Sequence, residues 1–125
     1  MFCQLLVNAF ILLAAPVEVP QVTNPIPSTQ ESVSKGEKIY KEKCSNCHGP
    51  QGKGDGPLGK LLGASQVKDL SSPHMGAKSD WELYQQVTNG KSPMPSYKNT
   101  LSDSDRWHLV NFIRTLNHTE NPIQQ

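Results

Sequence analysis

The sequence is poor in residues that build a large hydrophobic core. Only 6% of its 125 residues are aromatic, whereas nine are Gly and ten are Pro. A chain of this length forms one domain at most. A loop-rich domain with so little aromatic surface is only marginally stable from burial alone, and a bound apolar group would make up that deficit.

Dense basic runs are also missing. The formal net charge is +1, and the lysines are not clustered with interleaved aromatics, so we expect no nucleic-acid partner. Residues 1–34 contain two glutamates and no Lys or Arg, whereas most lysines lie between Lys35 and Lys98. A lysine-bearing face could steer an acidic protein partner, and an ordinary solvated face explains the same lysines equally well.

No apolar run is long enough to cross a bilayer as a helix, which takes about 20 residues. The run from Phe2 to Ala15 suits the apolar part of a secretory signal, although no Lys or Arg precedes it and no small-residue cleavage site is clear. We assign residues 1–15 to a signal-peptide-like or anchor segment. Residues 16–33 contain four prolines, which predicts a Pro-rich linker.

Cysteine is scarce, but two of the three cysteines lie in one motif. Residues 44–48 read Cys-Ser-Asn-Cys-His, the C-x-x-C-H attachment signature of a c-type haem. The two thiols can each bond a vinyl group of one porphyrin, and the following imidazole then lies beneath the iron. The motif predicts one haem c, covalently bound through Cys44 and Cys47, with His48 as an axial ligand.

Other uses of this motif have weaker support. A zinc site needs four ligands, and the third cysteine, Cys3, lies far upstream. A thioredoxin-like redox pair needs a βαβ context, and the flanking residues predict no strand. A disulfide across so short a loop would be strained. The conceivable zinc site would combine the motif with one further histidine: His74, His108 or His118.

Hydrophobic spacing and capping residues predict a helical chain. Two S-x-x-E boxes begin at Ser34 and Ser79, and Ser102 precedes the most strongly periodic apolar stretch. Residues 73–76 are predicted as a loop, and 118–125 as a frayed tail. The expected helices are 34–43, 58–62, 80–89 and 103–117.

A glycine-rich loop follows the motif. Four glycines fall within residues 49–56, so this stretch is predicted to be an irregular loop that can lie close to a flat ligand. A metal-ligating histidine normally donates its second ring N–H to a carbonyl. The backbone near Pro57 is our predicted acceptor for His48, and Leu70 is a predicted pocket or core residue.

Two methionines are candidates for the second axial position. Met94 lies between Pro93 and Pro95, which stiffen its loop and forbid regular structure. Without the haem motif such a methionine would be interpreted as core filling. With the motif, its thioether is the predicted sixth ligand, and Met75 is the competing candidate.

Taken together, residues 34–117 resemble class I cytochrome c, the small monohaem domain with His and Met axial ligands. The haem motif and Met94, set between prolines, match the family's attachment and ligand positions. Gly36 and Tyr40 match its helix-crossing pair, and Leu109 and Phe112 match the partner pair on the last helix. The loop after His48 departs from the family, because its usual proline position is not obvious.

The resemblance implies an all-α, cytochrome c-like fold, with three to five short helices packed around one covalent haem. The tracts around Asn89–Tyr97 and Asp105–Trp107 further resemble monohaem subunits of bacterial quinol:cytochrome c oxidoreductase complexes. Haem contacts are expected from Pro57, Leu70 and Tyr97.

The implied function is one-electron transfer, since two protein ligands leave no iron position for a substrate. We expect an electron-transfer protein rather than an enzyme, with oxidases, reductases or quinol-oxidising complexes as its partners. The implied location is the periplasm or the outer face of the cytoplasmic membrane, with membrane association through the N-terminus or a complex. The alternatives are a permanently docked subunit of a membrane oxidoreductase and, with less support, a gas sensor or peroxidase with an open iron.

Overall fold

The computed structural model describes residues 13–16 and 22–117, and within them the fold is all-α. Most of the 1–15 segment, Cys3 and the 118–125 tail lie outside the described residues. The described part contains no strand, only an isolated bridge between Lys91 and Met94. No helix in this part is both long and apolar enough to cross a membrane. The helices are α1 (Gln30–Lys43), α2 (Ser45–His48), α3 (Pro57–Leu62), α4 (Pro73–Gly76), α5 (Asp80–Asn89) and α6 (Asp103–Leu116).

The predicted fold class is confirmed, but the described residues form six helices rather than three to five. The two additional elements, α2 and α4, have four residues each. A single turn is too short to show helical periodicity in its sequence, so residues 73–76 were predicted as a loop. Ser72 caps α4, where its side chain accepts a hydrogen bond from the Met75 N–H.

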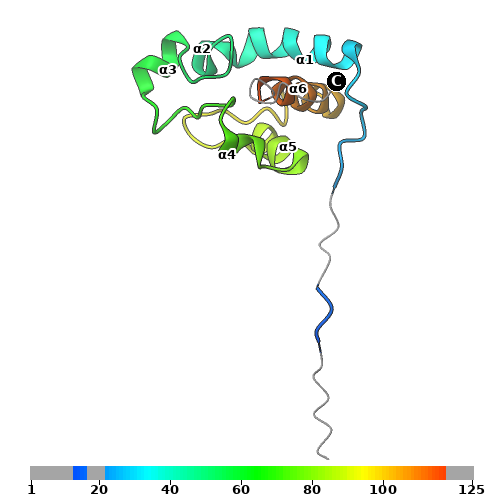
Figure 1. Ribbon diagram of the computed structural model, residues 1–125. Helices are drawn as coiled ribbons and strands as arrows, with labels where there is room; N and C mark the ends of the chain where they lie inside the picture. The colour runs from blue at the N-terminus through cyan, green and yellow to red at the C-terminus, as the bar shows by residue number, and fades with distance from the viewer. Residues whose placement is uncertain (1–12, 17–21, 118–125) are drawn as a thin grey trace, which may run out of the picture.

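The crossing of α1 over α6 is the centre of the fold (Figure 1). A Cβ on Gly36 would lie 2.1 Å from the His108 carbonyl oxygen and 2.8 Å from the Phe112 Cβ, so only glycine permits this approach. Four residues further along α1, the Tyr40 ring packs on Phe112 with centroids 5.0 Å apart. The packing of the predicted crossing pair, Gly36 and Tyr40, on Phe112 of the last helix is therefore confirmed.

The first helix begins earlier than predicted, at Gln30 rather than Ser34. Thr29 is the N-cap, since its hydroxyl accepts from the Ser32 N–H at 3.1 Å. Ser32 is only 2% exposed, because this first turn packs against α6. The S-x-x-E box at Ser34 therefore lies inside α1.

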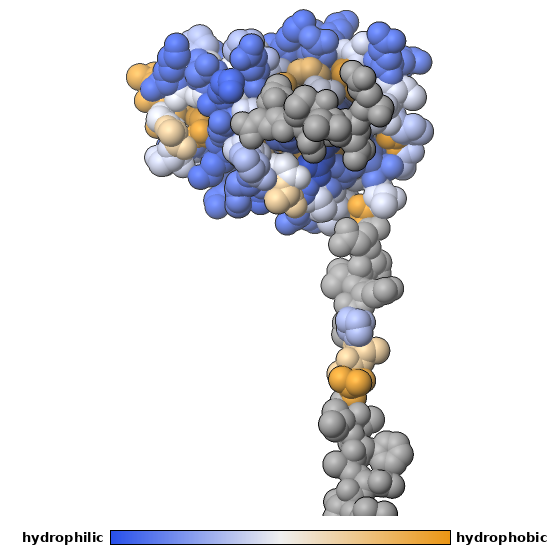
Figure 2. All heavy atoms as spheres, viewed as in Figure 1, coloured by the Kyte–Doolittle hydropathy of each residue, from blue (hydrophilic) through white to orange (hydrophobic). Residues whose placement is uncertain are grey.

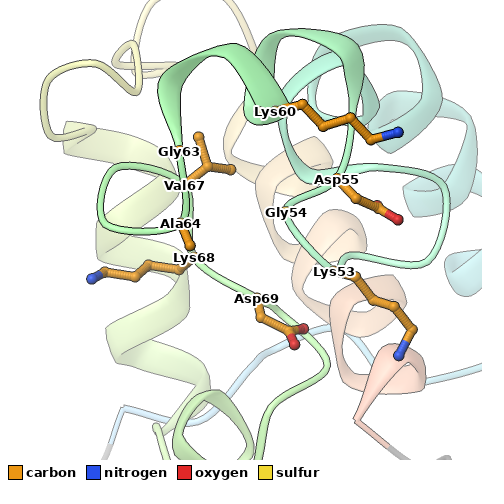
Figure 3. A pocket seen from close by; sticks show the side chains of 10 residues that line it. Lys53, Gly54, Asp55, Lys60, Gly63, Ala64, Val67, Lys68 and Asp69 are labelled. Atoms are coloured by element: carbon orange, nitrogen blue, oxygen red, sulfur yellow. The ribbon is translucent and has the colours of Figure 1, made fainter.

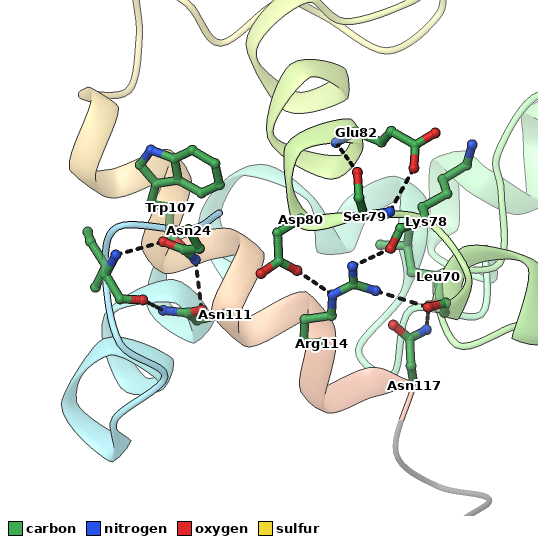
Figure 4. A network of polar contacts seen from close by, with 12 residues as sticks. Asn24, Leu70, Lys78, Ser79, Asp80, Glu82, Trp107, Asn111, Arg114 and Asn117 are labelled. Carbon is green, nitrogen blue, oxygen red and sulfur yellow. Dashed lines mark hydrogen bonds and ion pairs between the residues drawn. The ribbon is translucent and has the colours of Figure 1, made fainter. Parts of the chain in front are cut away.

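The segment before α1 is also fixed to α6 (Figure 4). Asn24 donates to the Asn111 side-chain oxygen at 2.8 Å and to the Trp107 carbonyl at 3.3 Å. Asn111, which is 4% exposed, donates in turn to the Ile26 carbonyl at 3.1 Å and the Ser32 hydroxyl at 2.8 Å. Part of the predicted linker is thus attached to the helical domain by a buried amide.

Helix α5 packs on α6 through aromatic side chains. The Tyr84 ring stacks with both Trp81 and Trp107, with centroid distances of 5.4 and 4.0 Å. The predicted helix and its capping box are confirmed, because Ser79 and Glu82 exchange hydrogen bonds at the helix start (Figure 4). The visible described surface is mostly hydrophilic, with small hydrophobic patches (Figure 2).

Candidate functional site

The Cys-x-x-Cys-His motif forms one compact turn after α1. Cys44 ends α1 by donating its N–H to the Tyr40 carbonyl at 2.8 Å. Its own carbonyl accepts from the N–H groups of Cys47 and His48 at 3.2 and 2.9 Å. Residues three apart on such a turn lie on one face, and both cysteines are free thiols among the described residues.

The state of Cys44 disfavours a redox role for this pair. Burial, with a smaller contribution from neighbouring Cys47, raises the pKa of the Cys44 thiol to about 12. Reactive redox cysteines have lowered pKa values, because the thiolate is the nucleophile. A buried, protonated thiol instead suits a structural or covalently attached position.

His48 is held in one tautomer by a backbone carbonyl. Its Nδ1 lies 3.0 Å from the Lys68 oxygen, and because a carbonyl only accepts, Nδ1 must carry the proton. Burial lowers the pKa of this imidazole, although the Lys68 carbonyl opposes the shift. The ring is therefore neutral near pH 7, with Nε2 as the lone-pair nitrogen that a metal needs.

The acceptor predicted near Pro57 is wrong, and the carbonyl of Lys68 takes its place. Pro57 is the first residue of α3, where backbone carbonyls point along the helix toward the next turn. The chain leaves α3 at Gly63 and returns past Val67 to reach the histidine. Leu70 then closes this return, since its N–H donates to the Gly52 carbonyl at 2.6 Å.

The glycines of the 49–56 loop and of α3 pack against the attachment turn. A Cβ on Gly56 would lie 2.3 Å from the Asn46 oxygen, and one on Gly59 would lie 2.0 Å from the Cys47 oxygen. Both contacts are with backbone, which cannot move aside cheaply. These two glycines let the loop and α3 support the turn that carries the thiols, and the closeness of the loop to a flat ligand stays a prediction.

A hollow of about 310 Å³ lies between this loop, α3 and the segment that follows α3 (Figure 3). Lys53, Lys60 and Lys68 surround it together with Asp55 and Asp69. Its lining includes no residue of the 44–48 turn, and the charges around it are of both signs. We therefore do not propose this hollow as the cofactor site.

The segment carrying Met94 reaches the attachment turn through Tyr97. Met94 exchanges backbone hydrogen bonds with Lys91 at 2.7 and 3.1 Å, which closes a tight loop. The Tyr97 hydroxyl donates to the Lys43 carbonyl at 3.0 Å, next to Cys44. Burial raises the pKa of Tyr97, and the two thiols of the motif add to this shift.

The predicted site residues are mostly brought together by the fold. Cys44 and Leu70 belong to the buried core, and Met94 and Tyr97 pack against it half-buried. Met75, the competing ligand, is 7% exposed within the same core. Pro57 is exposed and lies outside this cluster.

The two free thiols, one imidazole in a fixed tautomer and one half-buried thioether form a donor set that fits a covalent haem. A zinc site has less support, since the described residues contain no group of three His, Cys, Asp or Glu side chains placed to hold a metal. His108 bonds the Ser32 hydroxyl at 2.8 Å, near the far end of α1 from Cys44.

Sequence reasoning missed three contributors to this arrangement. The Lys68 carbonyl leaves no trace in a side-chain pattern. Arg106 and Asn111 are 8% and 4% exposed although both are polar. A signal for Arg106 did exist, because it stands three and four residues before Leu109 and Val110 and so falls on the buried stripe of the last helix.

Comparison with known proteins gives a consistent result. Residues 31–113 match the family described as cytochrome c oxidase, cbb3-type, subunit III. Cytochrome c6 from Anabaena variabilis is 35% identical over 80 residues, covering 62% of this chain and 84% of the relative.

Two solved structures also match. One is a chain of the Kuenenia stuttgartiensis reducing HAO-like protein complex, with a TM-score of 0.61 and 31% identity over 78% of this chain. The present chain covers 50% of that longer chain. The other is the KustC0563 c-type cytochrome, with a TM-score of 0.57 and 29% identity, covering 65% of this chain and 95% of that one.

Proposed function

We propose that this chain, which belongs to the cbb3-type cytochrome c oxidase subunit III family of c-type cytochromes and is an electron-transfer protein rather than an enzyme, carries one haem c. Cys44 and Cys47 would hold the haem covalently, and His48 and Met94 would be the ligands of its iron. When bound, haem c supplies an iron that gains and loses one electron.

The fixed tautomer of His48 is the observation that carries this proposal. Its Nδ1 proton is directed to the Lys68 carbonyl at 3.0 Å, so Nε2 is kept free of a proton. The imidazole ring is on the same turn as the two thiols. Attachment of both thiols to a porphyrin would therefore keep the imidazole at a high local concentration beside the iron. The Lys68 carbonyl also fixes the orientation of the ring, as hydrogen-bond partners of metal-bound histidines do.

Met94 is the better sixth ligand of the two candidates. Its segment is held at both ends, by the Lys91 backbone pairing and by the contact of Tyr97 with Lys43 beside the motif. Its side chain is half-buried at the margin of the core, whereas Met75 is enclosed within it. Two protein ligands would exclude substrate from the iron, which leaves electron transfer as the function.

We place the protein in a respiratory or related chain, in the periplasm or on the outer face of the cytoplasmic membrane, between larger redox partners. A docked subunit is the second candidate. It is favoured because the matching family is named for an oxidase subunit and one structural neighbour is part of a complex. A free carrier should elute as a monomer in size-exclusion chromatography, and a subunit should depend on partner chains.

The direct test is expression of the full chain with the cytochrome c maturation machinery. Mass spectrometry should find one covalent haem, and absorption spectra should change reversibly between oxidised and reduced states. The Cys44→Ala/Cys47→Ala variant should lose the covalent group. A colourless wild-type protein, or rapid carbon monoxide binding by the reduced form, would contradict the proposal.

A further inference from the structure

Arg106 is a buried cation whose contacts gather on one loop. It lies in the first turn of α6 and is 8% exposed. One terminal nitrogen donates to the carbonyls of Lys98 at 2.9 Å, Leu101 at 3.1 Å and Tyr97 at 3.4 Å. These three carbonyls belong to the segment 97–101, which directly follows the Met94 loop.

The other terminal nitrogen is fixed on a different element. It donates to the Tyr84 hydroxyl at 3.0 Å, and the Tyr84 hydroxyl in turn bonds the Asp103 carboxylate. The guanidinium carbon also stands 5.3 Å from the centre of the Tyr84 ring. Because that ring stacks on Trp107, the arginine is held on a rigid aromatic base.

Burial of this charge costs free energy, and a gain in stability does not by itself explain why an arginine lies here. Its Nε atom is buried without an acceptor among the described residues. Asp103, its nearest carboxylate, lies 3.8 Å away and has a side chain that is 70% exposed. A buried charge with an unsatisfied donor is often no more stable than an apolar residue of similar volume, whereas a planar group with several donors specifies the course of a loop.

Tyr97 links this loop to α5 and to the end of α1 beside Cys44. Its N–H donates to the Val87 carbonyl at 3.1 Å on α5, and its hydroxyl bonds the Lys43 carbonyl beside Cys44. Its carbonyl is among the Arg106 acceptors. Movement of Arg106 would therefore release the segment that fixes the C-terminal side of the Met94 loop.

We propose that Arg106 is a positioning residue for the sixth ligand: it holds segment 97–101 on α6 so that Met94 stays directed at the iron against competing ligands. This inference rests on the proposed function, because it requires that Met94 be the ligand. It assigns Arg106 no contact with the haem.

Arg114 provides a matched control on the same helix. It also clamps a loop, because it bonds Asp80 at 2.7 Å, the Gly76 carbonyl at 3.3 Å and the Lys78 carbonyl (Figure 4). That loop follows Met75 and not Met94. A lysine at either position keeps the charge but cannot reproduce the planar set of donors.

The experiment titrates ferric holoprotein with imidazole, a probe that must displace the sixth ligand to bind. Wild type is compared with Arg106→Lys, Arg106→Met and Arg114→Lys, and thermal stability is recorded for each. We expect both Arg106 variants to bind imidazole about tenfold more tightly or better, because several hydrogen bonds holding the loop are lost. When pH is raised, the sulfur-to-iron charge-transfer band of the Arg106 variants should also disappear at a lower pH than in wild type. Arg114→Lys should lose thermal stability, with its imidazole affinity and its charge-transfer band unchanged.

The outcomes distinguish failure of the Met94 assignment from failure of the positioning role of Arg106. If wild type shows no sulfur-to-iron band, the Met94 assignment fails and the inference fails with it. If the band is present but imidazole affinity is unchanged in Arg106→Lys and Arg106→Met, or rises equally in Arg114→Lys, only the positioning role is wrong. If neither Arg106 variant yields holoprotein while Arg114→Lys does, Arg106 serves folding and the positioning role is also rejected.

Discussion

Two segments of this protein present a methionine after the haem motif, and they are built differently. Met75 lies in the single turn α4, is 7% exposed and contributes to the core. Met94 lies in a proline-flanked loop at the margin of that core and is half-buried. Each segment is followed by backbone carbonyls that an arginine of α6 holds in place.

The difference shows how the same residue type serves packing in one place and presentation in the other. Apolar neighbours enclose Met75, so its contacts are made by its whole side chain. Met94 is held by backbone pairing with Lys91, and its half-buried side chain packs only at the margin of the core. A ligand is best presented by a segment whose rigidity comes from its own backbone.

Replacing the two methionines in turn should give the largest and most clearly opposed effects. Met94→Ala should abolish the sulfur-to-iron charge-transfer band and lower the reduction potential, since a thioether ligand favours ferrous iron. Met75→Ala should keep the band but lower the free energy of unfolding by about 2–5 kcal/mol, as expected for a buried methionine. Absorption spectra and denaturant unfolding measure both. The comparison breaks if the band survives in Met94→Ala and is lost in Met75→Ala.

Substitution of Gly36, at the crossing of α1 and α6, should have the next largest effect, a loss of stability. Gly36→Ala would place a Cβ 2.1 Å from the His108 oxygen, and forced backbone movement of this kind costs about 1–3 kcal/mol or more. Both methionine segments should loosen together, because both are anchored on α6. Gly76→Ala is the control, since its Cβ would meet only Asn117 atoms at 3.7 and 3.8 Å. Equal melting temperatures for the two variants would refute the role of the crossing.

A smaller effect should be confined to the Met94 side. Tyr97→Phe removes the hydrogen bond to the Lys43 carbonyl, which is worth about 1 kcal/mol, and should increase imidazole affinity severalfold. Ser96→Ala is the matched control, because Ser96 bonds the Thr88 carbonyl at 2.6 Å in the same loop without reaching the motif. An unchanged imidazole affinity in Tyr97→Phe would show that the tie to Lys43 does not restrain the ligand.

The smallest effect should appear on the Met75 side, at the start of α5. Hydrogen bonds from the Ser79 N–H and hydroxyl lower the pKa of the Glu82 carboxyl below its ordinary value. A lowered folded-state pKa means that this cap contributes stability at neutral pH and loses it as pH falls through the Glu82 pKa. An NMR titration should find the depressed pKa, and Ser79→Ala should return it toward the ordinary value. An unshifted Glu82 in wild type would contradict the capping geometry.

The features that sequence predicted well are those fixed by local spacing. Helices α5 and α6 follow from caps at Ser79 and Ser102 and from apolar residues at helical intervals. The Gly36 crossing was predictable because a missing side chain is itself the signal, here of a backbone approach. The Cys-x-x-Cys-His turn needs only five consecutive residues, so its chemistry could be recognised without any fold.

The features that sequence did not predict depend on distant contacts. Helix α1 begins after Thr29 rather than at the predicted Ser34, and its added first turn buries Ser32 against α6. The acceptor for His48 is a carbonyl twenty residues away, and all carbonyls look alike in a sequence. Arg106 required the loop 97–101 to fold back over α6 before its charge had a role.

The amide contacts of Asn24 have a geometric consequence for whatever the N-terminal segment is joined to. They fasten the chain to α6 just before α1, whereas the thiols follow the other end of α1 (Figure 1). A 14-residue helix is roughly 20 Å long, so α1 is a rigid spacer between the Asn24 contacts and the Cys-x-x-Cys-His turn. If the N-terminal segment serves as the proposed anchor, the proposed haem would be attached at the end of α1 remote from that anchor.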